Sequence, residues 1–410
     1  MAYEEESRHA PEVLTTVKQH NPAVTCLITS RSSGIQVERK YVGLALPNLV
    51  AGMKLVVFGL SVSSSWGNGH ATLWRGLIRA LVQLGHRVVF YERDVPYYAE
   101  HRDLLQLEFG ELKLYSDWQE VRSPARRDIE DADASIVTSY CPDGAVASEL
   151  VLSSSSGLRV FYDLDTPVTL ERLRTGEQVS YLPVEGLAHF DLVLSYTGGV
   201  ALDELKNRLG ARRVAPLYGS VDSRVHYPVP PVDRYRADLS YLGTYAEDRQ
   251  DALLRLFIEP ARRLPARRFL IGGAKYPQAF PWSDNIFFVR HLPPSEHSAF
   301  YCSSRMTLNV TRAPMAEMGY CPSGRLFEAA ACGAAVLSDS WDGLNEFFEP
   351  EAEILVVNTT KEALAALEIS DQELARLGRA ARERVLNDHT AERRALQLVT
   401  ALEGALTVEA

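Results

Sequence analysis

The sequence has few cysteines, no long apolar run and no excess of positive charge. Its five cysteines form no C-x-x-C pair, which excludes a disulfide framework and a cysteine zinc site and predicts a reducing, cytoplasmic setting. The apolar stretch 41–65 is interrupted by Pro47, Gly52 and Lys54, so we expect neither a membrane span nor a signal peptide. The formal net charge of -10 at pH 7 disfavours nucleic acid as a partner and favours small molecules.

What is present is the composition of a folded protein. Hydrophobic residues make up 46% of the 410 residues and charged residues 23%, a balance that allows large buried cores. This length exceeds a single ordinary core and favours two domains of about 150 to 200 residues. Residues 1–52 have mixed charge and weak periodicity, so we expect them to be an N-terminal extension whose role the sequence does not reveal.

Residues 53–230 alternate short apolar runs with segments of helical period. The runs that indicate strands are 54–60, 87–92, 134–139, 158–163 and 190–196, and helices are expected from Asn68 to Gly85 and near 143–153 and 199–209. This alternation predicts βαβ units around a parallel sheet. The first run, KLVVFGL, is almost continuously apolar, as in a strand covered on both faces.

A second array follows a stretch rich in proline at 216–231, which we interpret as an interdomain linker. Its predicted strands are 238–244, 267–273, 285–291, 305–310, 334–338 and 353–358, and its helices lie near 247–263, 294–303 and 323–332. Two more helices, broken at 387–390, end the chain, and the last one, 391–410, is expected to pack back on the first domain. The predicted fold class is therefore α/β, with Rossmann-like domains at 53–230 and 231–390 that face each other across a cleft, where such folds bind ligands.

The segment PSGRLFEAAACGAAVLSD, residues 322–339, places Arg325 and Glu328 among mostly apolar neighbours. Ser323 can cap a helix here, and Gly324 lets a ligand approach the helix start, where free N–H groups bind anions. Arg325 adds charge for the same phosphates, and Glu328 on the same helix face can accept two hydrogen bonds from a ribose diol. The alternative is an ion pair on a solvated face, but so apolar a helix has little solvated face.

Taken together, the motifs of the chain resemble those of a GT-B glycosyltransferase. The C-terminal half resembles the group related to spore-maturation CgeB proteins and, more distantly, family 4 of the retaining enzymes. The resemblance spans residues 53–400 and is carried by RLFEAAACGAAVLSDSWDGLNEFFEPEAEILVV (325–357), YLGTYAEDRQ (241–250), HLPPSEHSAFY (291–301), NVTR (309–312) and NDHTAERRA (387–395). These motifs are specific as a set, although each is weak alone.

The resemblance implies that the second domain binds a nucleotide sugar and the first binds the acceptor, with no cofactor and no metal. Glu328 matches the glutamate that holds the ribose hydroxyls of the donor. Gly243 and Arg249 match a glycine and a basic residue that face the donor phosphates. His291 and Leu292 lie in the stretch that usually surrounds the base.

Breaking the glycosidic bond leaves negative charge on the departing nucleotide. Without a metal, cations and helix dipoles must stabilise that charge, and we assign this role to Arg249 and Arg325. The chain departs from the family-4 pattern at Tyr320, where the pattern has an acid. Glu317 either replaces that acid or is a surface residue, and the identity of the donor sugar stays open.

In a GT-B cleft, the loop that holds Gly67, Gly69 and His70 faces the donor phosphates and the acceptor. A lone G-x-G lacks the spacing of a dinucleotide-binding motif. His70 is a candidate catalytic base because an unperturbed imidazole titrates near neutrality, with capping or packing as the alternative. Asp163 and Asp165 follow a strand and are expected to point to the cleft, either to bind or deprotonate the acceptor or to cap the turn that follows.

We therefore predict a metal-independent glycosyltransferase that moves a sugar from a nucleotide-diphosphate sugar to a glycan, small-molecule or protein acceptor. The sequence leaves open the donor base, the acceptor, the stereochemical outcome and the oligomeric state. One alternative is a sugar-nucleotide epimerase or hydrolase on the same fold, and another is a non-catalytic carbohydrate-binding or scaffold relative, which Tyr320 favours. The basic runs 211–213 and 261–268 are interpreted as solvated faces, with a peripheral membrane contact as the lesser alternative.

Overall fold

A computed structural model of the protein describes residues 15–17, 26–31, 34–38 and 52–406. The first three ranges form a small antiparallel sheet of β1 (Thr15–Val17), β2 (Cys26–Arg31) and β3 (Gly34–Glu38). Strands β2 and β3 pair with Leu27 opposite Glu38 and Arg31 opposite Gly34. This sheet belongs to a unit that is separate from residues 52–410, and the rest of the expected N-terminal extension up to residue 51 lies outside the described residues.

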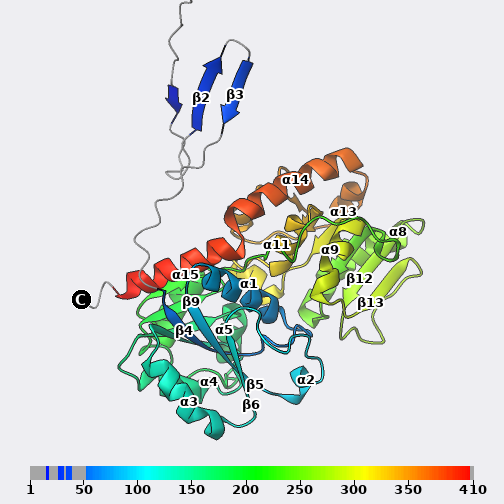
Figure 1. Ribbon diagram of the computed structural model, residues 1–410. Coiled ribbons are helices and arrows are strands. Elements are labelled where there is room, and N and C mark those ends of the chain that lie inside the picture. The colour runs from blue at the N-terminus through cyan, green and yellow to red at the C-terminus, as the bar shows by residue number, and fades with distance from the viewer. Residues whose placement is uncertain (1–14, 18–25, 32–33, 39–51, 407–410) are drawn as a thin grey trace, which may run out of the picture. The chain divides into compact units, whose positions relative to one another are not determined.

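The first large sheet has seven parallel strands in the order β10-β9-β8-β7-β4-β5-β6 (Figure 1). Its strands are β4 (Lys54–Gly59), β5 (Arg87–Arg93), β6 (Glu111–Tyr115), β7 (Ala134–Thr138), β8 (Leu158–Asp163), β9 (Leu192–Ser195) and β10 (Val214–Pro216). Its helices are α1 (Gly69–Gln83), α2 (Pro96–Ala99), α3 (Trp118–Glu130), α4 (Gly144–Leu152), α5 (Thr166–Arg174) and α6 (Val200–Leu209).

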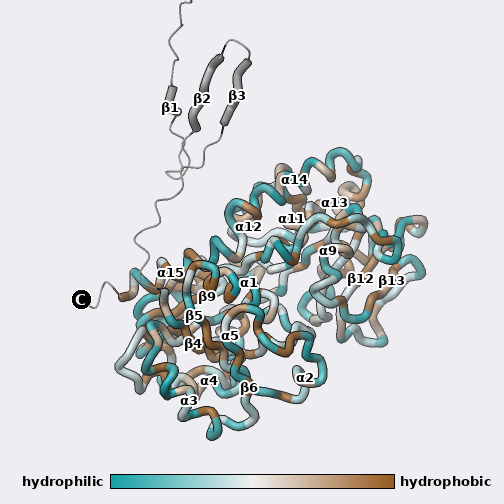
Figure 2. The backbone as a smooth tube through the Cα atoms, viewed as in Figure 1, coloured by the Kyte–Doolittle hydropathy of each residue, from teal (hydrophilic) through white to brown (hydrophobic). Residues whose placement is uncertain are grey.

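The predicted burial of β4 on both faces is confirmed. Leu55 and Val57 pack in the core that contains α1, whereas Val56 and Phe58 pack in the core that contains α3 and α4. All six residues of the strand are buried, and Figure 2 shows β4 in the brown of hydrophobic residues. Both faces of the strand are apolar because a helical layer covers each face of the sheet.

The second sheet has six parallel strands in the order β13-β12-β11-β14-β15-β16. Its strands are β11 (Ala237–Leu242), β12 (Phe269–Gly273), β13 (Ile286–Arg290), β14 (Ser304–Asn309), β15 (Ala335–Ser338) and β16 (Leu355–Val356). Its helices are α7 (Gln250–Leu253), which continues through a π-helix at Leu254–Ile258 into α8 (Glu259–Arg263), then α9 (Pro294–Ser303), α10 (Ala313–Met318), α11 (Gly324–Ala331), α12 (Leu344–Phe347), α13 (Thr360–Leu367) and α14 (Asp371–Asp388). This sheet also separates two cores, because Leu270 of β12 packs in one and Ile271 in the other.

The chain returns to the first sheet through its last helix, α15 (Ala391–Leu406) (Figure 1). Leu398 and Leu402 of this helix are buried in the same core as α1. The predicted break before it is held by two backbone hydrogen bonds, from Val221 N to the His389 carbonyl at 3.0 Å and from Ala391 N to the Val221 carbonyl at 2.9 Å. Among the helices in the described part of the chain, none is long and apolar enough to cross a membrane.

The buried His389 at this break makes stability depend on pH. Its ring stacks on Phe327 with centroids 4.7 Å apart, and Nδ1 accepts a hydrogen bond from Arg394 Nη2 at 3.2 Å. Burial, followed by the charges of Arg394 and Arg384, lowers the pKa of His389 to about 3. At pH values between this pKa and the ordinary pKa of histidine, the unfolded chain binds the proton more readily than the folded protein does. The free energy of unfolding therefore rises with pH in this range. From pH 7 to pH 5 we expect this group to remove about 2 kcal/mol of stability.

Urea unfolding of the wild type and of His389→Gln at these two pH values measures this contribution. Glutamine keeps an oxygen for Arg394 but does not titrate, so the variant should lose about 2 kcal/mol less than the wild type on acidification. Other titrating groups are common to both proteins and cancel in the comparison. Equal losses in the two proteins would contradict the assignment.

Candidate active site

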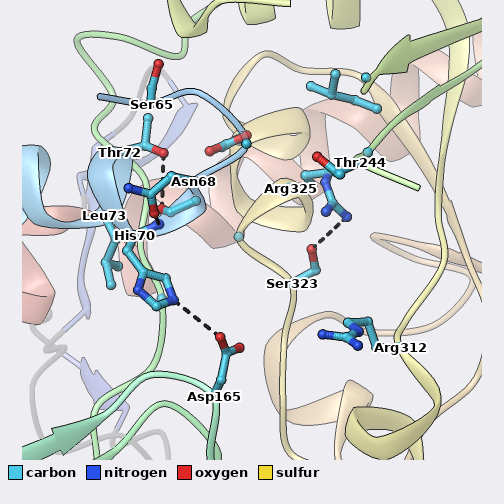
Figure 3. Close-up of a pocket in the computed structure, with 18 of the residues that line it drawn as sticks. Ser65, Asn68, His70, Thr72, Leu73, Asp165, Thr244, Arg312, Ser323 and Arg325 are labelled. Carbon is cyan, nitrogen blue, oxygen red and sulfur yellow. Dashed lines mark hydrogen bonds and ion pairs between the residues drawn. The ribbon is translucent and has the colours of Figure 1, made fainter. Parts of the chain in front are cut away.

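A cavity of about 630 Å³ lies between the carboxyl ends of the two sheets. The strand order of each sheet reverses at its first strand, β4 or β11, and such switch points leave a crevice beyond the strand ends. Twelve of the residues predicted for the site line this cavity: Gly67, Gly69, His70, Asp165, Gly243, Arg249, His291, Leu292, Ser323, Gly324, Arg325 and Glu328. Figure 3 shows residues of the first domain on one side of the cavity and residues of the second domain on the other.

The loop between β4 and α1 is anchored by the fully buried carboxylate of Glu92. This carboxylate accepts hydrogen bonds from Ser61 Oγ at 2.8 Å and from the Val62 N–H at 2.7 Å. Asn68 caps α1, as predicted, because its side chain accepts a hydrogen bond from the His70 N–H at 3.1 Å. These contacts fix the start of α1 and thereby aim His70 at the cavity.

His70 and Asp165 come together although they follow different strands. His70 Nε2 lies 3.4 Å from Asp165 Oδ2 (Figure 3). The other ring nitrogen, Nδ1, is buried and has no hydrogen-bond partner within the described residues. The carboxylate of Asp165 is therefore the group of this pair that can meet a ligand directly, with His70 held beside it.

The prediction that Asp163 points to the cleft is wrong. Its side chain is fully buried and does not line the cavity. Its Oδ1 accepts a hydrogen bond from the Asp165 N–H at 3.0 Å, and burial raises its pKa to about 6. Asp163 is the last residue of β8, whose side chains alternate between two covered faces, so only the turn beyond it reaches the cavity. Asp165 makes no side-chain cap at the start of α5.

Positive charge collects on the second-domain side of the cavity. Arg249 is 9% exposed, its Nη1 donates to the Thr244 carbonyl at 3.3 Å, and its buried Nε has no partner within the described residues. Burial, together with the charges of Arg325 and Arg312, lowers the pKa of Arg249. Arg312 pairs with Asp248 at 3.0 Å, but neither Arg249 nor Arg325 has an ion-pair partner in residues 52–406. Two cations at the wall of one cavity thus have no carboxylate within ion-pair distance among the described residues, although Asp248 and Glu328 act on them from farther away.

Helix α11 brings its N-terminus to the same place. Ser323 occupies the N-cap position, but its side chain makes no capping hydrogen bond, contrary to the prediction. Its Oγ instead accepts from Arg325 Nη1 at 3.4 Å (Figure 3). The start of the helix therefore keeps its positive dipole charge free of a side-chain cap, beside the guanidinium of Arg325.

Glu328 does not form the surface ion pair with Arg325 that the sequence left as an alternative. Its Oε2 lies 3.5 Å from His297 Nδ1 and 3.9 Å from His226 Nε2, and it accepts from the Tyr301 hydroxyl at 3.5 Å. Burial opposes ionisation, but His226, His297 and Arg325 outweigh it and lower the pKa of Glu328 to about 2. The carboxylate is therefore ionised at neutral pH and lines the cavity as an acceptor.

Tyr320 serves packing rather than the cavity. Its ring lies between Gly199 of the first domain and Gly343 of the second, because a Cβ on either glycine would stand 2.6 Å from it. Its carbonyl accepts a hydrogen bond from the Gly198 N–H at 3.0 Å. Glu317 is exposed and lines a separate cavity of about 200 Å³. Neither residue supplies the missing acid.

His291 and Leu292 lie at the rim that joins the two domains. The His291 ring lies 3.6 Å from the Trp66 ring, measured between centroids, and Trp66 stacks on His101 at 4.1 Å on its own side. The Leu292 carbonyl is 3.3 Å from His297 Nε2.

Sequence reasoning missed several residues of this cavity, including Tyr140, Tyr196, Thr244, Arg312 and His297. Arg312 and His297 lie within the motifs that carried the resemblance, and their type and position there were the available signal. Tyr196 donates a hydrogen bond from its hydroxyl to the Pro322 carbonyl at 2.8 Å. No local pattern indicated that contact between the domains.

Comparison with known proteins addresses the fold and the second half of the chain. Residues 249–400 match the model of a family described as glycosyl transferase-like. No curated protein matches the chain. Sucrose-phosphate synthase from Thermosynechococcus elongatus is 16% identical, with a TM-score of 0.61 over 87% of this chain and 100% of that chain.

Two further structures are similar. HepE from Anabaena, in complex with UDP and glucose, is 13% identical with a TM-score of 0.59 over 86% of this chain and 100% of its own. An alpha-glucosyltransferase in complex with UDP and DNA is 12% identical with a TM-score of 0.62 over the same shares. The chain thus has the predicted α/β fold of GT-B glycosyltransferase structures, and its residues 249–400 match the glycosyl transferase-like family.

Proposed function

We propose that the protein is a glycosyltransferase that moves a sugar from a nucleoside-diphosphate sugar to an acceptor hydroxyl. The observation that carries the proposal is a pair of cations at one wall of the cavity, Arg249 and Arg325, that form no direct ion pair within the described residues. A buried guanidinium without a counter-ion is costly. A diphosphate that binds both residues and the uncapped start of α11 removes that cost.

The rest of the donor fits around this diphosphate. Glu328 is an ionised acceptor in the same helix and can take hydrogen bonds from both hydroxyls of a ribose. His291 and Leu292 then lie toward the base, beyond the ribose. Several similar structures hold UDP, which makes a UDP-sugar the first donor to test. Within glycosyltransferases we favour the CgeB-like group, on the motifs quoted above.

On the acceptor side we assign Asp165 as the group that accepts the proton of the attacking hydroxyl, with His70 positioned beside it. Arg249 and Arg325 stabilise the negative charge that develops on the departing nucleotide, a task they can perform without a metal. The net charge of -10 favours a small molecule, glycan or protein as acceptor over DNA.

A second candidate is a nucleotide-binding relative that no longer transfers sugar. Tyr320 favours it, because the family-4 pattern has an acid at this position and this chain has a ring packed between Gly199 and Gly343. Such a protein would bind nucleotide through the same cations but would neither transfer nor hydrolyse the sugar. Binding and turnover must therefore be measured separately.

The test is a thermal-shift and donor-hydrolysis screen with UDP-, GDP-, dTDP- and ADP-sugars on the wild type, Glu328→Gln and Glu373→Gln. Glu373 is half-exposed and pairs with Arg376 away from the cavity, which makes it a matched control. We expect one nucleotide class to stabilise the wild type and the control, and at least about a tenfold weaker affinity in Glu328→Gln, the cost of a lost charged hydrogen bond. No response to any nucleotide would refute the proposal, and binding without turnover would favour the second candidate.

A further inference from the structure

We propose that His226, His297 and Glu328 form a binding site for Zn²⁺ in the wall of the cavity. The three residues come from separate parts of the chain: His226 from the interdomain linker, His297 from α9 and Glu328 from α11. His226 is 2% exposed, whereas His297 and Glu328 line the cavity. The fold thus gathers two imidazoles and a carboxylate at one buried point.

The distances suit a zinc ion. Nε2 of His226 and Nδ1 of His297 are 3.4 Å apart, and Oε2 of Glu328 lies 3.5 Å from the second and 3.9 Å from the first. A point in their plane that is equally far from all three atoms lies about 2.1 Å from each, within the range of zinc–nitrogen and zinc–oxygen bonds. A hydrogen bond between two of these residues would bring only two of the three atoms close together, whereas here all three atoms lie close to one another.

The positions of the protons on the two histidines also favour a bound cation. His297 Nε2 faces the Leu292 carbonyl at 3.3 Å, so the hydrogen of a neutral ring belongs on Nε2 and the lone pair on Nδ1. That lone pair then faces both His226 Nε2 and the Glu328 carboxylate. One proton can satisfy only two of the three atoms, whereas a cation satisfies all three. The Leu292 carbonyl also supplies the outer hydrogen bond that metal-binding histidines usually make.

The ligand set selects a transition metal over the hard cations. Mg²⁺ and Ca²⁺ prefer oxygen ligands, whereas two imidazoles and one carboxylate suit Zn²⁺. Three protein ligands leave the ion free to take one further ligand, such as water. If the proposed function is right, Zn²⁺ and the ribose compete for Glu328, and zinc inhibits transfer.

The experiment uses the full chain, freed of metal with a chelator and titrated with ZnCl₂ in competition with a chromogenic chelator. The variants are His297→Gln and His226→Gln, and the control is His189→Gln, because exposed His189 pairs with Glu185 at 2.9 Å and does not line the cavity of about 630 Å³. Loss of a residue that only hydrogen-bonds to a metal ligand costs about 10- to 100-fold in metal affinity. We expect zinc affinity to fall by more than this in both site variants and to stay unchanged in the control. Mg²⁺ should not compete. If His226→Gln does not fold, His297→Gln decides alone.

A wild type that binds no zinc, or binds it equally well after His297→Gln, overturns the proposal. UDP binding is measured on the metal-free protein, so the two proposals fail separately. If the protein binds UDP but not zinc, the proposed function is supported and the zinc site is refuted. If it binds zinc but not UDP, the zinc site is supported and the proposed function is refuted. If it binds both, and saturating zinc leaves the UDP affinity unchanged, the proposed competition for Glu328 is refuted.

Discussion

Arg249→Met is expected to stabilise the free protein while it removes most of the activity. Methionine fills a similar volume without a buried charge that lacks a counter-ion, so the free energy of unfolding should rise by about 1–2 kcal/mol. The same change deletes a cation that, in the proposed function, faces the leaving nucleotide, and kcat should fall about 10²- to 10³-fold. These opposite effects distinguish a ligand-binding arginine from a structural one, whose loss would lower stability.

Urea unfolding without nucleotide and initial rates of donor turnover measure the two effects. Arg255→Met is the control, because Arg255 lies on the same helical segment and is exposed. The control should leave both quantities nearly unchanged. The assignment fails if Arg249→Met unfolds more easily and still turns over donor at the wild-type rate.

Asp165→Asn is expected to reduce transfer by about 10²- to 10⁴-fold and to leave donor affinity unchanged. The amide cannot accept the proton of the acceptor hydroxyl, whereas the residues that we propose for the donor, Arg249, Arg325 and Glu328, belong to the other domain at the cavity. The effect should therefore appear in kcat and in kcat/KM for the acceptor but not in UDP binding.

The neighbouring carboxylate supplies the control. Asp163→Asn changes the same side chain two residues away, but that side chain is buried away from the cavity. Because burial raises the pKa of Asp163 to about 6, a neutral amide is well tolerated there, and activity at neutral pH should persist. Loss of transfer in Asp163→Asn with full transfer in Asp165→Asn would reverse the assignment.

The fold could be predicted where strands are buried on both faces. The runs at β4, β7 and β15 are wholly buried, so each appears in the sequence as a short, mostly apolar stretch. The edge strand β6, ELKLY, was missed because it is largely unburied and carries charged residues. Helix α3 was missed because only a stripe of it is apolar and Pro124 lies inside it.

The lining of the cavity could be predicted where one segment supplies several residues to it. Gly324, Arg325 and Glu328 lie within five residues of each other, and all three line the cavity, whereas the phosphate and ribose site that their spacing indicates stays a prediction. The association of His226 with Glu328 could not be predicted, because it depends on how the linker packs against α9 and α11. The orientation of Asp163 and Asp165 depends on where β8 ends, because a shift of the strand by one residue turns each side chain to the opposite face of the sheet.

The return of α15 to the first domain bears on how such proteins can be recombined. The second domain is inserted between two crossings of the chain, one in the linker and one at His389 and Thr390, while α15 remains part of the core around α1. A chimera made by one cut would pack α1 against the last helix of the other parent, whose side chains did not evolve to fill the places of Leu398 and Leu402 in this core. Exchange of the second domain between such proteins therefore requires a cassette with two junctions, and the final helix must come from the same parent as the first domain.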